Sequence, residues 1–118
     1  MLLSRILEVR YFIATDGHSP FAVWFGGLDP IARAKVTTAV ARMETGNLSN
    51  VKSVGDGVLE YRIDFGPGYR LYFGRDGEAL VILLTGGSKK RQQRDIKAAA
   101  SMWRDYRTSK KVRDGKNG

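Results

Sequence analysis

The chain has 118 residues, the length of one domain, and its 42% hydrophobic residues are enough for a single packed core. It has no cysteine and one histidine, which excludes a disulfide framework, a thiol nucleophile and a structural zinc site, and we expect no metal or cofactor. The net charge is +8, and residues 89–118 carry all of it, which predicts a neutral domain that holds a polyanion such as a nucleic acid at one edge.

The first part of the chain predicts one strand followed by two helices. Residues 6–14 alternate in polarity, so we expect a half-buried strand whose core-facing side chains are Leu7, Val9, Tyr11 and Ile13. Ser19-Pro20 and Asp29-Pro30 each combine an N-cap residue with a proline at the first helical position. These pairs predict helices over residues 20–25 and from residue 30 to about residue 45.

A β-hairpin is predicted next, after a loop over residues 48–56. Residues 57–65 and 69–74 alternate in polarity. They flank Gly66-Pro67-Gly68, a turn in which glycine tolerates a positive φ and proline fixes its own φ.

The length of that turn predicts which side chains lie opposite each other. A three-residue loop pairs Phe65 with Tyr69, both on the core face. The other face is then expected to point away from the core, with Arg62 opposite Tyr72 and Asp64 opposite Arg70, beside Val58 and Glu60.

The last part of the chain predicts a buried strand and a basic helix. Residues 78–85 are apolar enough for a central strand covered on both faces. Residues 91–107 carry an apolar stripe at helical spacing and a basic stripe roughly 100° away. The predicted order is β-α-α-β-β-β-α, an α+β fold with a four-stranded, mainly antiparallel sheet packed by helices. We expect one domain over residues 1–108 and a basic, flexible tail over residues 109–118.

Nothing in the sequence predicts export or membrane insertion. Arg5, Glu8 and Arg10 interrupt the apolar start, and the longest apolar run, residues 79–84, is far shorter than a membrane span. We therefore expect a cytoplasmic protein.

Two motifs stand out, Gly66-Pro67-Gly68-Tyr69-Arg70 in the hairpin and Gly86-Gly87-Ser88-Lys89 with Gln92 after the buried strand. Together with Gly46-Asn47-Leu48 and Asp95-Ile96, they resemble the RelE/HigB toxins of type II toxin–antitoxin modules, in the branch of addiction-module killer proteins. The resemblance covers about residues 5–107. It departs at Ser88, where the family usually carries an aspartate, so that Lys89 lacks its usual carboxylate neighbour.

The resemblance implies a RelE-like fold and a ribosome-dependent endoribonuclease that cleaves mRNA and is inhibited by an adjacently encoded antitoxin, often of helix-turn-helix type. The candidate catalytic residues are Arg62, Arg70, Tyr72, Lys89 and Gln92. The candidate RNA- or ribosome-binding residues are Lys52, Lys90, Arg91, Arg94 and Lys97. Arginine stays cationic and binds phosphate oxygens in pairs, and Tyr72 could stack on a base or transfer a proton.

Several alternatives stay open at this point. Asp64 and Arg70 could form only a cross-strand ion pair, with Arg62 covering Tyr72. The chain could poison DNA gyrase, as the related ParE toxins do, or bind nucleic acid without cleaving it. His18 could be a general base, but its place before a helix N-cap favours a surface loop. Without it, proton transfer falls to lysine or tyrosine, and the enzyme would depend on the ribosome to orient its substrate.

Overall fold

Both predicted helix starts are confirmed in the structure, a computed structural model that describes residues 6–115. Helix α1 spans Pro20–Gly26 and helix α2 spans Pro30–Glu44. The side-chain oxygens of Ser19 and Asp29 each accept a hydrogen bond from a backbone N–H of the first turn, at 3.0 and 2.9 Å. Each cap satisfies a donor that the helix leaves without a partner, so the chain enters each helix at a fixed residue.

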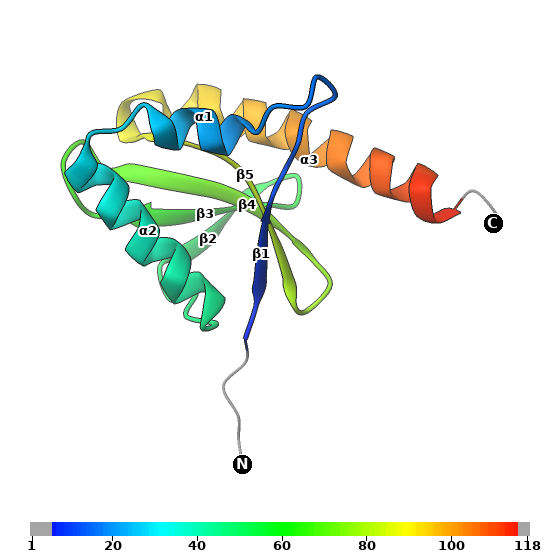
Figure 1. Cartoon of the computed structure of the whole chain (residues 1–118), viewed down its shortest axis with the longest axis horizontal. Helices are drawn as coiled ribbons and strands as arrows, with labels where there is room; N and C mark the ends of the chain where they lie inside the picture. The colour runs from blue at the N-terminus through cyan, green and yellow to red at the C-terminus, as the bar shows by residue number, and fades with distance from the viewer. Residues whose placement is uncertain (1–5, 116–118) are drawn as a thin grey trace, which may run out of the picture.

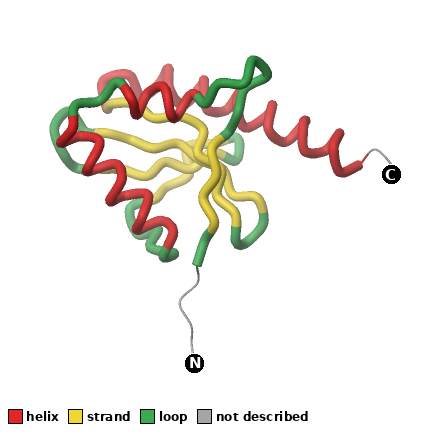
Figure 2. Tube along the Cα trace, in the orientation of Figure 1, coloured by secondary structure: helices red, strands yellow, loops and turns green. Residues whose placement is uncertain are grey.

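Within residues 6–115, five strands form one sheet in the order β1-β5-β4-β3-β2, and Figure 2 draws the strands in yellow. The strands are Glu8–Tyr11 (β1), Val51–Gly55 (β2), Val58–Ile63 (β3), Tyr69–Asp76 (β4) and Leu80–Ser88 (β5). β1 runs parallel to β5, and the other neighbours are antiparallel. The α+β class is confirmed, but the sheet has one strand more than predicted. Residues expected in a loop form the edge strand β2, which owes its extended shape to pairing with β3.

Helices cover both faces of the sheet (Figure 1). On one face α1 and α2 pack over a core that includes Phe21, Val36, Met43, Leu71 and Phe73. On the other face a 3-10 turn, Lys89–Arg91, leads into helix α3, Gln92–Gly115. This helix packs over a second core that includes Val58, Tyr72, Ile82, Leu84 and Trp103. Strand β5 is buried from residue 81 to residue 87, as predicted for a strand covered on both faces.

The second core corrects the prediction that one face of the hairpin points away from the core. Val58, Glu60 and Tyr72 were expected on that face, yet all three are fully buried. The apolar stripe of α3 needs an apolar surface to pack on, and the second face of the sheet supplies it.

Strand β1 shows a related difference. Leu7 packs in the first core as predicted, but Phe12 packs in the second, and Tyr11 and Ile13 are 47% and 55% exposed. The Phe12 N–H still donates to the Leu83 carbonyl at 2.8 Å, so Phe12 faces the second core by the same alternation that turns Leu7 to the first. The strand itself ends at Tyr11 and is shorter than predicted.

The hairpin register differs from the prediction by two residues. Arg62 pairs with Arg70 and Glu60 with Tyr72, because the connection runs from Asp64 to Gly68 and is longer than the predicted turn. A shift of two residues keeps every side chain on its face and changes only the cross-strand partners.

Helix α3 continues beyond the domain boundary predicted at residue 108 and ends at Gly115. Asp76, at the end of β4, accepts hydrogen bonds at 2.6 Å from the Tyr106 hydroxyl and from Lys110 Nζ. The hydrogen bond from Lys110 lowers the pKa of Asp76. Residues 109–115 of the predicted tail are therefore helical, and residues 116–118 lie outside the described residues. Within residues 6–115, no helix combines the length and the apolar character that crossing a membrane requires.

Candidate functional site

One end of the sheet brings together most of the predicted site residues. There β3 and β5 end, β4 begins, and the 3-10 turn after β5 leads into α3. The loop between β3 and β4 is tied to the 3-10 turn, because the Lys89 N–H donates to the Gly68 carbonyl at 2.8 Å. Gly68 has a left-handed φ of +78°, and a side chain there would meet Arg70 Nη1 at 3.2 Å. This end of the sheet is therefore held by backbone contacts as well as by side chains.

The carboxylate of Glu60 lies at the centre of this end and has no exposed surface. Its Oε2 accepts hydrogen bonds from Gln92 Nε2 at 2.8 Å and from the Tyr72 hydroxyl at 3.1 Å. Arg62 Nε lies 3.4 Å from Oε1, and Arg70 Nε lies 3.6 Å from Oε2. Four of the five predicted catalytic residues thus converge on one buried acid that was not among the predicted site residues.

Glu60 was missed because the alternation of β3 placed it on a face expected to point away from the core. A signal was present in the apolar stripe of the last helix, which includes Ile96, Ala99 and Trp103. A stripe of this kind implies that a second face of the sheet is covered, and an acid on a covered face needs partners.

Glu60 also accounts for two arginines that lie side by side. Arg62 and Arg70 are cross-strand partners, and like charges in that position repel. The Glu60 carboxylate lies within 3.6 Å of both guanidinium groups and offsets one of the two positive charges, which leaves the cluster with a net charge of +1. The two side chains differ in access, since that of Arg62 is 51% exposed and that of Arg70 is 7% exposed. A phosphate arriving from solvent would therefore meet Arg62, with the charge of Arg70 behind it.

Tyr72 lies too deep for the base stacking that the sequence suggested. Its ring packs in the core under α3 and has no exposed surface. Burial raises the pKa of Tyr72, and the neighbouring Glu60 carboxylate raises it further. The phenol therefore stays protonated and donates to Glu60. Gln92, from the first turn of α3, binds the same carboxylate and so links the helix to β3.

A second carboxylate, that of the half-buried Asp95, packs against the backbone of β5. Gly87 leaves the room for it, because a side chain at that position would overlap the Asp95 carboxylate. Asp95 Oδ2 is buried and has no hydrogen-bond partner among the residues that the structure describes. Burial raises the pKa of Asp95. On the opposite face Gly86 leaves room for the Trp24 ring in the same way, so the glycine pair serves packing on both sides of the strand.

Three cations border a hollow at the mouth of this network. Arg62, Arg70 and Lys89 line a depression of about 360 Å³, together with Asn50 and Asp64. Ligand sites typically measure about 300–1,000 Å³, so this hollow can receive a group the size of a phosphate with its sugar. We call it the hairpin hollow.

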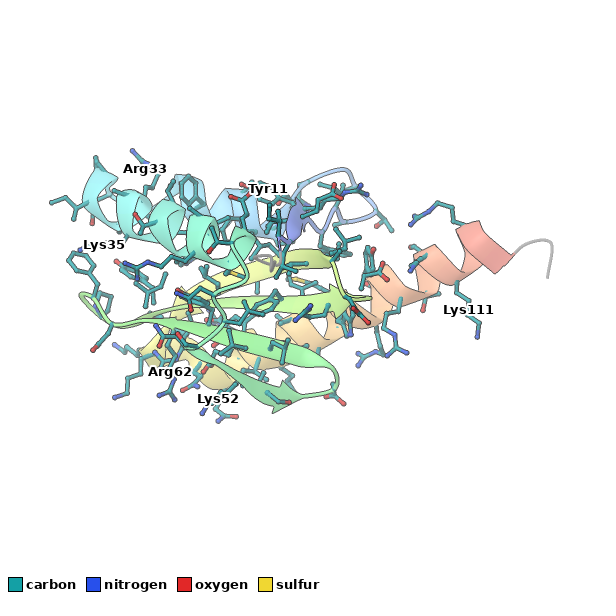
Figure 3. The ribbon with its side chains drawn as sticks, turned by 90° about the horizontal axis from the view of Figure 1, so that it is seen from below. Tyr11, Arg33, Lys35, Lys52, Arg62 and Lys111 are labelled. Carbon is teal, nitrogen blue, oxygen red and sulfur yellow. The ribbon has the colours of Figure 1, made fainter. Side chains whose placement is uncertain are left out.

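The predicted RNA-binding residues continue from the hairpin hollow along α3. Lys89 also borders a depression of about 400 Å³ formed by the start of α3, which includes Lys90, Arg91 and Arg94. Arg94 in turn borders a third depression that includes Lys97. Lys52 is exposed on the edge strand β2, where it stands opposite Glu60 in the strand register. Figure 3 shows Lys52 near Arg62. The predicted cations therefore follow one another around this end of the molecule.

His18 is not part of this arrangement. It is exposed in the loop that leads into α1, and its Nδ1 lies 2.5 Å from Asp16 Oδ1. That hydrogen bond lowers the pKa of Asp16. In Figure 1 this loop adjoins the right-hand end of α1, whereas α3 begins toward the left. No group of three histidine or acidic side chains that could hold a metal ion occurs in the part of the chain that the structure describes.

The part of the chain that forms the candidate site is similar to known proteins. Residues 23–104 match the family described as Phage derived protein Gp49-like (DUF891). A relative from Haemophilus influenzae, described as an uncharacterized protein, is 45% identical over 80 residues, which are 67% of this chain and 81% of the relative. The family match runs from α1 into α3, so it includes Glu60 and all of the candidate catalytic residues.

Proposed function

The chain belongs to the phage-derived Gp49-like family, a toxin-type family of toxin–antitoxin modules, and we propose that it is a RelE/HigB-type toxin that cleaves mRNA on the ribosome. The observation that carries the proposal is the hairpin hollow, where Arg62 and Lys89 are exposed and Arg70 stands behind them. Cations set around one small hollow suit a phosphodiester in a single strand.

The chemistry is attack of a ribose 2′-oxygen on the adjacent phosphorus. The new P–O2′ bond forms as the P–O5′ bond breaks, which leaves a 2′,3′-cyclic phosphate and a free 5′-hydroxyl. Arg62 donates N–H groups to the non-bridging oxygens, where negative charge grows in the transition state, and Arg70 adds a second positive charge. Lys89 donates a proton to the departing 5′-oxygen.

The 2′ proton passes to a solvent water, and this transfer is the step for which the side chains of this chain are least equipped. Glu60 is buried with four partners, the pKa of Tyr72 is raised, and His18 lies in a distant loop. We therefore expect slow cleavage by the isolated protein. In this proposal the ribosome holds the 2′-oxygen in line with the phosphorus and the departing 5′-oxygen. Such positioning lowers the activation barrier without a general base from this chain.

The test is induced expression in bacteria with mapping of mRNA 5′ ends, together with cleavage in a translation extract. Arg62→Ala and Lys89→Ala should each lower the rate by a factor on the order of 10²–10³ while the protein stays folded. Lys111→Ala is the matched control, since it removes an exposed cation near the far end of α3 (Figure 3). The assignment is wrong if both folded site variants cleave mRNA as fast as the control.

The same experiment separates two other functions. Intact mRNA together with gyrase-dependent DNA breaks would identify a ParE-like poison. Nucleic-acid binding without cleavage, DNA breaks or growth arrest would identify a non-enzymatic module.

The proposal includes a cytoplasmic antitoxin encoded next to this chain. An acidic antitoxin segment would complement the +8 charge and associate fast at low salt. Co-expression of the adjacent open reading frame should restore growth, and the association rate should fall as salt rises. If no neighbouring gene product restores growth, the antitoxin proposal fails, and an association rate that ignores salt would exclude electrostatic attraction.

A further inference from the structure

The hairpin hollow continues past Arg62 toward α2. A second depression of about 310 Å³ lies between α2 and the β3–β4 loop. It shares Asn50, Arg62, Ile63 and Asp64 with the hairpin hollow. Because the same four residues border both spaces, the two depressions adjoin each other at the β3–β4 hairpin. We call the second depression the α2 groove.

One face of α2 supplies cations to this groove. Lys35, Thr38, Ala39 and Arg42 line it, and their spacing puts all four on the same side of the helix. Lys35 and Arg42 are exposed and lie about 10 Å apart along the helix axis, from the rise of 1.5 Å per residue. Two separate points of positive charge therefore face the groove.

The loop holds one of these cations at the rim. Lys35 Nζ lies 5.0 Å above the centre of the Phe65 ring, within the range of a cation–π contact. Figure 3 shows Lys35 and Arg62 at the same end of the molecule, on α2 and on the sheet, whereas Lys111 lies at the other end. The two adjoining depressions thus have Lys35 near one end, Arg62 in the middle, and Lys89 with the start of α3 at the other.

We propose that the α2 groove binds the sugar–phosphate backbone of the RNA segment next to the cleaved bond, with Lys35 and Arg42 on its phosphates. This inference rests on the proposed function, because it extends the path of the same substrate. Both depressions lie at the small end of the range for ligand sites, which fits a single strand better than a duplex. Asp64, in the shared part, repels phosphate but can accept hydrogen bonds from a base amino group or a 2′-hydroxyl.

The test measures binding without cleavage. The probe is a short labelled single-stranded RNA in which every 2′-hydroxyl is methylated, so that no nucleophile is present. The Lys35→Ala/Arg42→Ala variant should bind it severalfold more weakly than the parent. The slope of log K against log salt should become shallower by roughly 1.4, since each phosphate contact on a single strand contributes about 0.7.

The matched control is Arg107→Ala/Lys111→Ala, which removes the same net charge from exposed positions toward the end of α3. It should keep the parent slope. Equal changes in both double variants would mean that only the overall charge attracts RNA, and an unchanged slope in the α2 variant would mean that RNA does not enter the groove. Loss of antitoxin affinity with unchanged RNA binding would make the groove a protein interface and overturn the proposal.

The two proposals can fail separately. A parent protein that never cleaves mRNA refutes the proposed nuclease and leaves the binding result intact. A parent that cleaves mRNA while the α2 variant keeps its salt slope refutes the groove alone.

Discussion

Replacing Glu60 with glutamine removes one buried charge and keeps the shape of the side chain. In the parent, Glu60 Oε2 accepts hydrogen bonds from Tyr72 and Gln92 and lies near the Arg70 guanidinium. The other oxygen, Oε1, faces Arg62. A glutamine at this position can keep its carbonyl oxygen toward Tyr72, Gln92 and Arg70. Its NH₂ group must then point toward Arg62. That arginine is half exposed and can swing into water, so the principal loss falls on Arg70.

The size of the loss follows from the exposure of the two arginines. The Arg70 side chain is 7% exposed, so after the substitution its guanidinium has no counter-ion and cannot be hydrated instead. Removing one partner of a buried ion pair destabilises a protein by about 3–5 kcal/mol. Arg62 adds at most about 1 kcal/mol, because exposed ion pairs contribute little. Domains of this size are stable by about 5–15 kcal/mol, so Glu60→Gln should remain folded but melt roughly 10–20 °C lower.

A second substitution separates the charge effect from a general packing defect. Arg70→Met removes the cation that Glu60→Gln leaves without a counter-ion. The double variant should regain stability over Glu60→Gln, with an interaction energy of roughly 1–3 kcal/mol in the double-mutant cycle. It should not regain mRNA cleavage, because the Arg70 charge is absent. Urea unfolding followed by tryptophan fluorescence measures the stability, since Trp24 and Trp103 pack in the two cores.

Two results would refute this reasoning. If the unfolding free energy of Glu60→Gln lies within about 0.5 kcal/mol of the parent, Arg70 has another counter-charge. If the two substitutions are additive, Glu60 and Arg70 do not interact, and the network described for this end of the sheet does not control stability.

Three further predictions concern the basic surface and the buried groups beside it. Arg94→Glu/Lys97→Glu should weaken RNA or ribosome binding and flatten its salt dependence while changing thermal stability little; an unchanged salt slope would place the binding surface elsewhere. Gly86→Ala should lower the unfolding free energy by about 1–3 kcal/mol because its side chain would overlap the Trp24 ring, whereas Gly26→Ala, with open space around it, should not; equal melting temperatures would contradict this. Burial raises the pKa of Asp95 above 3.8, the ordinary aspartate value, so folding favours the protonated carboxyl. As pH rises from below 3.8 toward neutral, the parent should therefore lose unfolding free energy relative to Asp95→Asn, which cannot ionise. Urea unfolding across that pH range checks this, and a stability difference that stays constant or shrinks as pH rises would show that the carboxyl is not desolvated.

Features set by local chemistry were predicted from the sequence. The caps at Ser19 and Asp29 act within one turn of their own helices, so they fix helix starts whatever the rest of the chain does. The alternation in the hairpin gave the correct face for Tyr61, Leu71 and Phe73, which pack in the first core.

Features set by contacts between distant segments were not predicted. Strand β2 is extended because β3 lies beside it, and the hairpin register follows from a β3–β4 connection that is longer than the predicted turn. The burial of Glu60 depends on α3, whose Gln92 follows it 32 positions later in the chain. The candidate site lies where these long-range contacts meet, so the sequence pointed to its candidate cations but not to the buried acid among them.

The order of the strands has a consequence for when the candidate site can form during synthesis. β1 is the first strand to be made and pairs with β5, the last, so that Glu8 aligns with Leu80. During synthesis the sheet stays open, and Glu60 stays without Gln92, until residues 80–92 have been made and have left the ribosome. The cations from Lys89 to Lys97 follow β5 in the chain, so they are joined after the rest of the sheet. The candidate site is therefore completed only when both ends of the sheet have met, which requires almost the full length of the domain to be free to fold.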